Sequence, residues 1–232
     1  MIVDFHTHVE YKNLNEKYST QEFVQAMDIG WVDKSIILGN DQSDMGSKPS
    51  WVDISWMKVA TNFEDEDVAD FCNQFPDRLI GFTSIHPDRY LPHKKIERAI
   101  KEFRMKGVKL YPHSGFYPND PRLDLVYQKC VELRVPVMIH TGPKAVKWQY
   151  IKYNNPTFID DVATKFPDLE IIISHGGYPW VEEFMAVVYS NENIIVDITF
   201  LDYIEEVFKK PRLTEETIKR LIELIGPKRL VW

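Results

Sequence analysis

Residues 169–177, LEIIISHGG, hold the pattern that decides the fold. The run is apolar on both faces of an extended chain, and it ends in a histidine followed by two glycines. Strands of this kind belong to parallel sheets whose two sides are covered by helices. Seven further short apolar runs occur along the chain, at residues 2–6, 34–40, 78–85, 107–112, 135–142, 193–200 and 228–232.

Amphipathic segments separate these runs, with apolar residues at the i, i+3, i+4 and i+7 spacing of a helix. They cover residues 19–30, about 50–75, 92–107, 122–133, 157–168, 179–191 and 214–226. Eight strands that alternate with helices fit a (β/α)8 barrel. A doubly wound open sheet is the main alternative, but no Gly-rich phosphate loop follows any strand. We therefore predict an α/β fold, a (β/α)8 TIM barrel that forms a single domain over residues 1–232.

The composition is that of a soluble globular protein, with 44% hydrophobic and 27% charged residues. A net charge of −7 argues against a nucleic-acid partner, which would require a basic surface. The chain shows neither a secretory signal nor an apolar run of the length that spans a membrane. Cys72 and Cys130 are far apart and outside any CxxC pattern, so we expect buried thiols in a reducing compartment. These features predict a cytoplasmic protein.

Four histidines stand at the ends of predicted strands: His6, His8, His140 and His175. His6 and His8 are two residues apart on an extended chain, so both side chains should point to the same face. In a barrel, the carboxyl ends of the strands form the rim that carries the active site. Neutral imidazoles are ligands for zinc and similar divalent ions. The sequence therefore predicts a divalent metal at this rim, with a histidine beside it that could move a proton.

The remaining histidines carry weaker signals. We interpret His86 as a hydrogen-bonded structural residue and His93 as a surface residue. His113 lies in the loop after residues 107–112, where it could line a pocket. Long loops at residues 40–50 and 112–122 lie on the side of the predicted barrel that carries the active site. The long segment 141–156 could either roof a pocket or be an irregular solvated loop.

Four segments together resemble a known family: VDFHTH (3–8), GVKLYP (107–112), PVMIHTGP (136–143) and DLEIIISHGGYPW (168–180). In this order they are similar to the amidohydrolase superfamily, specifically its amidohydrolase-2 branch. That branch includes aminocarboxymuconate-semialdehyde decarboxylase and related decarboxylases, hydratases and lactone hydrolases. The resemblance implies a distorted (β/α)8 barrel with one divalent metal, usually zinc. It also implies that His6, His8 and His140 bind the metal, that His175 transfers a proton, and that a homodimer is possible.

The sequence lacks one residue that the family has. The family's last metal ligand is an aspartate after strand eight, whereas the chain ends in GPKRLVW at Trp232. We therefore expect a chain truncated at its C-terminus, with the final helix absent and the barrel left unclosed at an exposed strand edge. Asp197 could approach the rim, but a structural carboxylate is the favoured interpretation. Asp4 shares the predicted face of His6 and could orient a ligand.

Lys109 and Tyr111 lie in the fourth predicted strand, two residues apart, and should face the same way. We expect Lys109 to bind a carboxylate or carbonyl of the substrate and Tyr111 to donate a hydrogen bond to it. The alternative is a lysine paired with a structural carboxylate inside the barrel.

These residues lead to three functional hypotheses. The first is a metal-dependent hydrolase that acts on a small carboxylated ester, lactone or amide through a metal-activated water. The second is a non-oxidative, metal-dependent decarboxylase, in which His175 would protonate the carbon that loses carbon dioxide. The third, which is less favoured, is a non-catalytic binding protein on the same fold.

Overall fold

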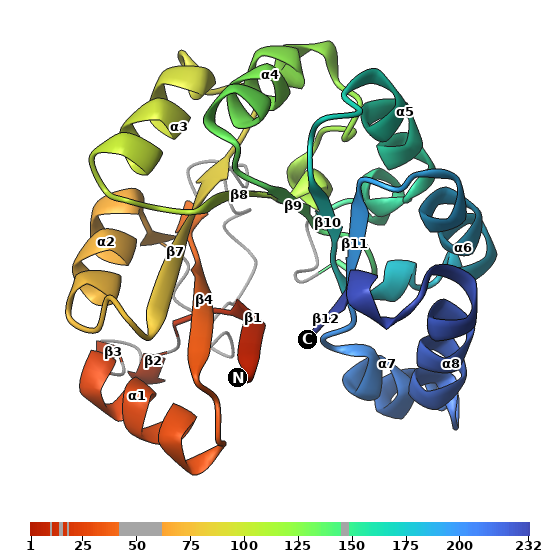
Figure 1. Cartoon of the computed structure of the whole chain (residues 1–232), viewed down its shortest axis with the longest axis horizontal. Helices are drawn as coiled ribbons and strands as arrows, with labels where there is room; N and C mark the ends of the chain where they lie inside the picture. The colour runs from red at the N-terminus through yellow and green to blue at the C-terminus, as the bar shows by residue number, and fades with distance from the viewer. Residues whose placement is uncertain (10, 14–15, 18, 42–61, 145–148) are drawn as a thin grey trace, which may run out of the picture.

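The computed structural model describes residues 1–9, 11–13, 16–17, 19–41, 62–144 and 149–232. Eight parallel strands form one sheet that curls into a nearly closed barrel, with helices around its outside (Figure 1). The order of the strands in the sheet follows their order along the chain. They are β1 (Val3–Thr7), β4 (Lys34–Leu38), β7 (Leu79–Ile85), β8 (Gly107–Leu110), β9 (Val137–Ile139), β10 (Ile171–Ile173), β11 (Ile194–Asp197) and β12 (Leu230–Val231). The predicted (β/α)8 barrel is confirmed.

The helices cover the outer face of the sheet. They are α1 (Thr20–Ile29), α2 (Asp65–Asn73), α3 (Pro92–Lys101), α4 (Asp124–Leu133), α5 (Thr157–Lys165), α6 (Val181–Ser190), α7 (Leu201–Phe208) and α8 (Leu213–Ile225). Short 3-10 turns lie at Pro112–Ser114, Pro121–Leu123, Ile151–Asn154, His175–Gly177 and Pro227–Arg229. Two small antiparallel pairs, β2 (Tyr11–Asn13) with β3 (Glu16–Lys17) and β5 (Asn40–Asp41) with β6 (Asn62–Phe63), complete the described structure.

Two helices differ from the sequence prediction. The segment expected to be helical from about residue 50 to 75 is helical only in α2, while Asn62–Phe63 forms β6 and residues 50–61 lie outside the described part. Helix α7 was not predicted. It has eight residues between Phe200 and Lys209, both in left-handed conformations, and it buries only Leu201 and Ile204. Its apolar residues Leu201, Ile204 and Phe208 do follow the i, i+3 and i+7 spacing of a helix, so the sequence carried a signal for it.

The barrel has separate inner and outer cores. Inside, apolar side chains from seven of the eight strands pack together: Phe5, Ile36, Leu38, Ile80, Phe82, Met138, Ile172, Ile195 and Val231. Alternate residues of the same strands, such as Ile171 and Ile173 of β10, pack outward against the helices. This division follows from the two-residue side-chain period of a strand.

Strand β8 contributes no apolar side chain to the inner core. Its inward positions are Gly107 and Lys109, because Val108 and Leu110 pack in the outer core. The Phe82 ring occupies the space beside Gly107, where an added Cβ would lie 2.4 Å from two ring atoms. The absent side chain of Gly107 therefore makes room for Phe82, one layer below the buried amine of Lys109.

We expect Gly107→Ala to destabilise the fold by about 1–3 kcal/mol, because the methyl group overpacks the inner core against Phe82. Urea unfolding followed by circular dichroism would measure this. Gly30→Ala is the matched control, since its Cβ would come no closer than 3.4 Å to any neighbour and its φ is −82°. Equal stabilities for the two variants would contradict the packing argument.

Strand β1 is irregular at the position that matters for the site. Its register against β4 shifts between Asp4 and Thr7, which marks a β-bulge. The bulge explains how Phe5 packs in the inner core while the next residue, His6, also reaches the interior. The Phe5 N–H donates to the carbonyl oxygen of Trp232 at 3.0 Å, so one backbone hydrogen bond joins β1 to the residue after β12.

Candidate metal centre

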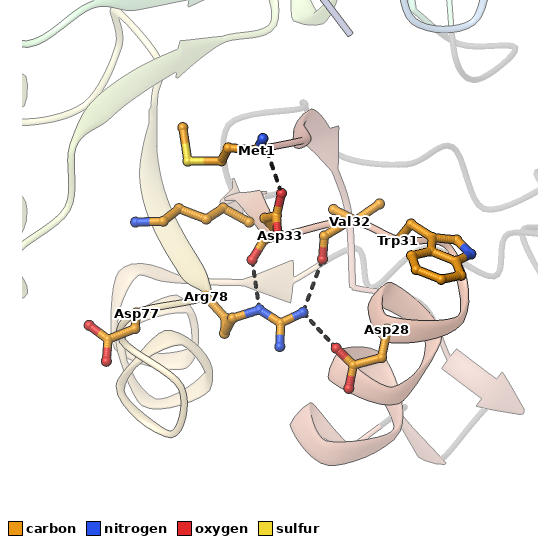
Figure 2. Close-up of a pocket in the computed structure, with 8 residues that line it drawn as sticks. Met1, Asp28, Trp31, Val32, Asp33, Asp77 and Arg78 are labelled. Atoms are coloured by element: carbon orange, nitrogen blue, oxygen red, sulfur yellow. Dashed lines mark hydrogen bonds and ion pairs between the residues drawn. The ribbon is translucent and has the colours of Figure 1, made fainter.

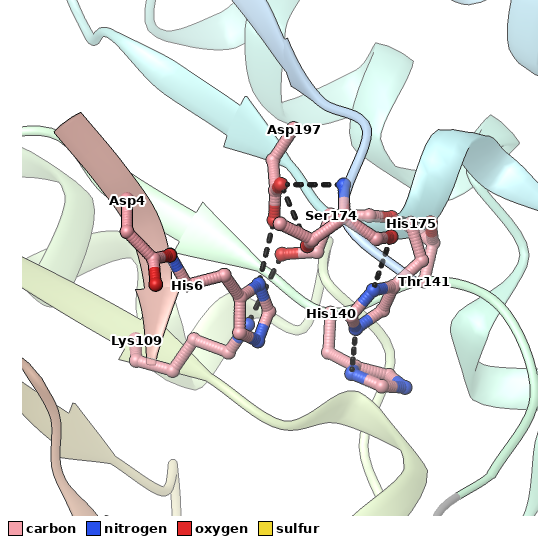
Figure 3. Close-up of polar contacts among 9 residues, drawn as sticks. Asp4, His6, Lys109, His140, Thr141, Ser174, His175 and Asp197 are labelled. Atoms are coloured by element: carbon pink, nitrogen blue, oxygen red, sulfur yellow. Dashed lines mark hydrogen bonds and ion pairs between the residues drawn. The ribbon is translucent and has the colours of Figure 1, made fainter. Parts of the chain in front are cut away.

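The four histidines predicted to converge do lie together at one rim of the barrel. The ring centroids are 5.4 Å apart for His6 and His8, 4.7 Å for His6 and His175, and 4.7 Å for His140 and His175. His6 and His8 come from the carboxyl end of β1, and His140 and His175 from those of β9 and β10. Figure 3 shows His6, His140 and His175 close together. Potential ligand atoms of His6, His175 and Asp197 all lie within 4.8 Å of one another.

The hydrogen bonds of His140 and His175 fix where their lone pairs point. His140 Nε2 lies 3.1 Å from the carbonyl oxygen of Pro143, and His175 Nδ1 lies 3.1 Å from that of Thr199. A carbonyl oxygen only accepts, so these two nitrogens carry the hydrogens of the neutral rings. The inner nitrogens, His140 Nδ1 and His175 Nε2, then face each other at 3.2 Å as two lone pairs.

Two lone pairs at this distance need a positive charge between or beside them. Burial opposes a proton, since it is the main cause that holds the pKa of both His140 and His175 well below the ordinary value. A divalent ion bound to His140 Nδ1, with His175 Nε2 beside it, would supply that charge, because neutral imidazole nitrogens are ligands for zinc and similar ions. The donor set therefore fits a borderline divalent cation.

Asp197 completes this arrangement, although the sequence analysis favoured a purely structural role for it. Its Oδ2 lies 2.6 Å from His6 Nδ1 and its Oδ1 accepts from the backbone N–H of Thr199, so it is bonded to backbone and to the cluster together. The carboxylate only accepts, so His6 Nδ1 is the donor and His6 Nε2 is left as a free lone pair. This is the carboxylate–histidine pairing that orients metal ligands. The signal available in the sequence was the register of β11, which places Asp197 on the same face as Ile195 of the inner core.

Asp4 is connected to His6 in a different way from the one expected. Its Oδ1 accepts a hydrogen bond from the backbone N–H of His6 at 3.0 Å, rather than from the imidazole (Figure 3). The carboxylate that meets the His6 ring is that of Asp197.

His8 and His113 flank the cluster. Burial is the main cause that lowers the pKa of each to about 3. Nδ1 of His8 is buried and has no hydrogen-bond partner among the described residues. His113 packs edge to face on His140, with 4.3 Å between ring centroids. His8 thus offers an unengaged nitrogen beside His6, and His113 lines the site, as the sequence suggested it could.

Lys109 is fully buried beneath the imidazoles. Its Nζ donates to Ser174 Oγ at 3.1 Å and lies 5.3 Å from the centre of the Tyr111 ring. Burial lowers the pKa of Lys109 to about 7, and only the charge of Asp197 opposes that shift. Tyr111 donates its hydroxyl to the carbonyl oxygen of Gly39 at 2.9 Å. Lys109 is therefore a buried amine that, when protonated, has no close carboxylate to pair with among the described residues.

The backbone at His175 is held in an uncommon conformation. His175, Gly176 and Gly177 have φ values of 63°, 56° and 71°, all in the left-handed region. A histidine there costs roughly 1–3 kcal/mol and persists only where its surroundings fix it. Gly177 is required by packing as well, since an added Cβ would lie 2.3 Å from Phe184. The SHGG sequence thus turns the chain sharply after β10, and this turn positions the imidazole.

Other sequence candidates lie outside the cluster. His86 Nδ1 accepts from the backbone N–H of Asp88 at 3.2 Å, which confirms its structural role. His93 is half-buried rather than fully on the surface, because it packs at the start of α3. Cys72 and Cys130 are free and buried, as expected.

A hollow at the opposite end of the barrel has a structural explanation. It lies where β4 and β7 begin, and Arg78 crosses it (Figure 2). The guanidinium donates to the carbonyl oxygen of Asp33 at 2.6 Å, to Asp28 Oδ1 at 2.7 Å and to the carbonyl oxygen of Val32 at 3.0 Å. Arg78 therefore ties α1 to the strand starts, at the barrel end that serves stability.

The buried imidazoles predict acid sensitivity of the metal-free protein. Burial lowers the pKa of His6, His8, His113, His140 and His175, whereas each returns to about 6.5 when the chain unfolds. The unfolded state then binds more protons below pH 6.5, so stability falls as the pH falls, by about 1.4 kcal/mol per pH unit for each imidazole. The five imidazoles together then cost about 7 kcal/mol per pH unit, so with total stabilities of about 5–15 kcal/mol we expect unfolding between about pH 4 and 6.

Urea unfolding in the presence of a chelator, at pH values from 5 to 8, would measure this dependence. His113→Asn removes one titrating ring and should reduce the slope by about 1.4 kcal/mol per pH unit. A stability that stays constant from pH 8 to pH 5 would contradict the prediction.

Comparison with known proteins adds four findings. The amidohydrolase family model matches residues 3–232. Protein fluG of Emericella nidulans is 26% identical over 107 residues, which are 45% of this chain and 11% of that protein, so the chain spans only a small part of this curated relative. A probable 2-pyrone-4,6-dicarboxylic acid hydrolase from Acinetobacter baumannii superposes with a TM-score of 0.67 at 14% identity, covering 100% of this chain and 82% of its own. The 5-carboxyvanillate decarboxylase of Sphingomonas paucimobilis gives 0.67 at 17% identity, covering 93% and 72%.

The structural neighbours confirm the fold, and hydrolases and decarboxylases both occur among them. Among the helices that the structure describes, none is long and apolar enough to cross a membrane. The match over residues 3–232, together with the motifs and the barrel, shows that the chain belongs to the amidohydrolase family, in its amidohydrolase-2 branch.

Proposed function

We propose that this protein is a metal-dependent enzyme that hydrolyses a small carboxylated ester, lactone or amide. The observation that carries the proposal is the convergence of unprotonated imidazole nitrogens at the rim, from His6, His140 and His175, with His8 beside them. His6, His8 and His140 would hold one divalent ion, with zinc as the expected metal. When bound, such an ion supplies Lewis acidity, which acidifies a water molecule and polarises a carbonyl group.

His175 is the residue proposed to move the proton. Its Nδ1–H is engaged by the carbonyl oxygen of Thr199, so Nε2 is the basic atom and points into the cluster. In hydrolysis, Nε2 would accept a proton from water and later return it to the leaving group. The left-handed backbone at His175 supports this role, since such strain collects at functional residues.

Lys109 and Tyr111 are proposed to select the substrate. The buried ammonium of Lys109 lies at the base of the cluster and lacks a close carboxylate, so a substrate carboxylate would supply the missing countercharge. Tyr111 lies close to both Lys109 and His8, with its ring 6.4 Å from that of His8. Its hydroxyl hydrogen is given to the carbonyl oxygen of Gly39, so its ring, rather than the expected hydrogen bond, would contact the substrate. A small acid is therefore the substrate class that we expect.

Decarboxylation is the second candidate function. The same Nε2 of His175 could protonate the carbon that loses carbon dioxide, and Lys109 could hold the acid before that step. The likeness to the 5-carboxyvanillate decarboxylase of Novosphingobium aromaticivorans, whose structure contains manganese, favours this alternative. It superposes with a TM-score of 0.66 at 19% identity, covering 90% of this chain and 68% of its own.

One assay panel separates the two reactions. Zinc- and manganese-loaded protein would be given 2-pyrone-4,6-dicarboxylic acid, 5-carboxyvanillate and 2,6-dihydroxybenzoate, the last being the compound bound in a 2,6-dihydroxybenzoate decarboxylase of similar fold. Ring opening and carbon dioxide release would be measured in parallel. Metal-dependent ring opening without carbon dioxide supports the hydrolase, and carbon dioxide release supports the decarboxylase. A preparation that retains no divalent ion above trace amounts would contradict both and leave the binding-protein hypothesis.

A further inference from the structure

Two hydrogen-bond networks around the imidazoles end on one residue, Thr199, two positions after β11. Its backbone N–H donates to Asp197 Oδ1 at 3.0 Å, and its hydroxyl donates to the same oxygen at 2.7 Å. Its carbonyl oxygen accepts from His175 Nδ1 at 3.1 Å. Thr199 therefore uses three polar groups, and each is bonded to the cluster.

The first network determines how the Asp197 carboxylate is turned. Two donors on Oδ1 leave Oδ2 as the oxygen that meets His6 Nδ1 at 2.6 Å. Asp197 is fully buried, so its carboxylate is not exposed to solvent. Among the described residues, the hydrogen bonds from Thr199 and His6 therefore determine how the carboxylate group is rotated. Thr199 therefore sets the direction of the free His6 lone pair through two successive hydrogen bonds, one from Thr199 to Asp197 and one from His6 to Asp197.

The second network determines the tautomer of His175. Because a carbonyl oxygen can only accept, contact with Thr199 requires the hydrogen on Nδ1 and leaves Nε2 as the lone pair. Thr199 therefore orients two imidazoles, that of His6 from β1 and that of His175 from the end of β10. Thr199 is itself only half-buried, so packing does not account for the arrangement of its polar groups.

We propose that Thr199 is a positioning residue for the metal centre, which orients His6 through Asp197 and sets the tautomer of His175. It touches neither a substrate nor the proposed ion, and it acts only through these two side chains. This inference rests on the proposed metal-dependent function. Outer partners of this kind typically contribute about 10–100-fold to metal affinity.

Thr199→Val and Thr199→Ser form a matched pair, because valine keeps the shape and loses the hydroxyl, while serine keeps the hydroxyl and loses the methyl. Zn²⁺ affinity would be measured by chelator competition at pH 8, beside thermal unfolding of the metal-free forms. We expect Thr199→Val to bind Zn²⁺ about 10-fold more weakly, at the lower end of that range because the backbone N–H still donates to Asp197, and Thr199→Ser to remain near the wild type. A residue with only a structural role would lower the melting temperature and leave the affinity unchanged, and that result would overturn the proposal.

The outcome is separable from that of the proposed function. If the wild type binds no Zn²⁺, the metal-dependent function fails, and ring ¹⁵N NMR of the metal-free proteins decides the inference instead. Loss of the downfield His6 Nδ1–H signal in Thr199→Val, with its retention in Thr199→Ser, supports positioning by Thr199. An unchanged signal in Thr199→Val overturns it.

Discussion

Replacing both first-strand histidines, in His6→Ala/His8→Ala, is expected to reduce the metal content from about one divalent ion per chain to trace amounts and to abolish turnover. The double change removes the nitrogen that Asp197 orients and the one that has no protein partner. Loss of an orienting partner alone weakens metal binding by about 10–100-fold, so loss of two proposed ligands should exceed 100-fold. Metal analysis after gel filtration would measure this.

The fold should survive this change, which makes the result interpretable. Neither imidazole belongs to the apolar cores, and Nδ1 of His8 gives up no hydrogen bond when it is removed. Removal of His6 takes away the donor to Oδ2 of the buried Asp197, so we expect a loss of stability that thermal unfolding would measure beside the metal content. If the double variant misfolds, His8→Asn is the second variant to test, because it changes one residue and keeps a polar side chain. His86→Asn is the control, because its ring bonds to the Asp88 backbone outside the cluster. Full metal content in a folded double variant would remove His6 and His8 from the site.

The sequence could predict the barrel and its histidines because both depend on local patterns. All eight strands were predicted from short apolar runs, and the imidazoles follow from their places at the strand ends. A parallel barrel brings strand ends to one rim whatever the loops do. This arrangement depends only on the order of the strands and helices. The sequence could therefore predict that the four histidines, His6, His8, His140 and His175, lie close together.

The features that the sequence did not reveal depend on contacts between distant segments. The β1 bulge changes the facing of Phe5 and His6, and it arises from pairing with β4. The role of Asp197 depends on its distance to His6, 191 residues away. The tautomer of His175 depends on a carbonyl oxygen, which every residue carries, so no residue type marks it. Such hydrogen-bond networks can be identified only when the positions of the backbone atoms are known.

We expect Lys109→Met to raise the free energy of unfolding and to lower the turnover of a carboxylated substrate. Burial lowers the pKa of Lys109 to about 7, from about 10.5 in the unfolded chain, so the folded state disfavours the charged form. Methionine keeps the length and removes the charge. Replacing a buried charge with an apolar side chain is neutral or stabilises by about 1–4 kcal/mol. Turnover of a carboxylated substrate should fall by about 10- to 150-fold, since a hydrogen bond to a charged group contributes about 1.5–3 kcal/mol.

The pH dependence identifies the cause of this stabilisation. Between about pH 7 and 10.5 the unfolded wild type binds the extra proton, so wild-type stability rises with pH and the advantage of Lys109→Met shrinks and vanishes near pH 10.5. Lys95→Met is the control, because Lys95 lies 3.6 Å from Asp65 and donates to the carbonyl oxygen of Ser84 outside the cluster. It should lose stability and keep its activity. A Lys109→Met variant that is less stable than the wild type at pH 7 would show instead that the ammonium is well compensated in the fold, and Lys109 would then have no unmatched charge to offer a substrate.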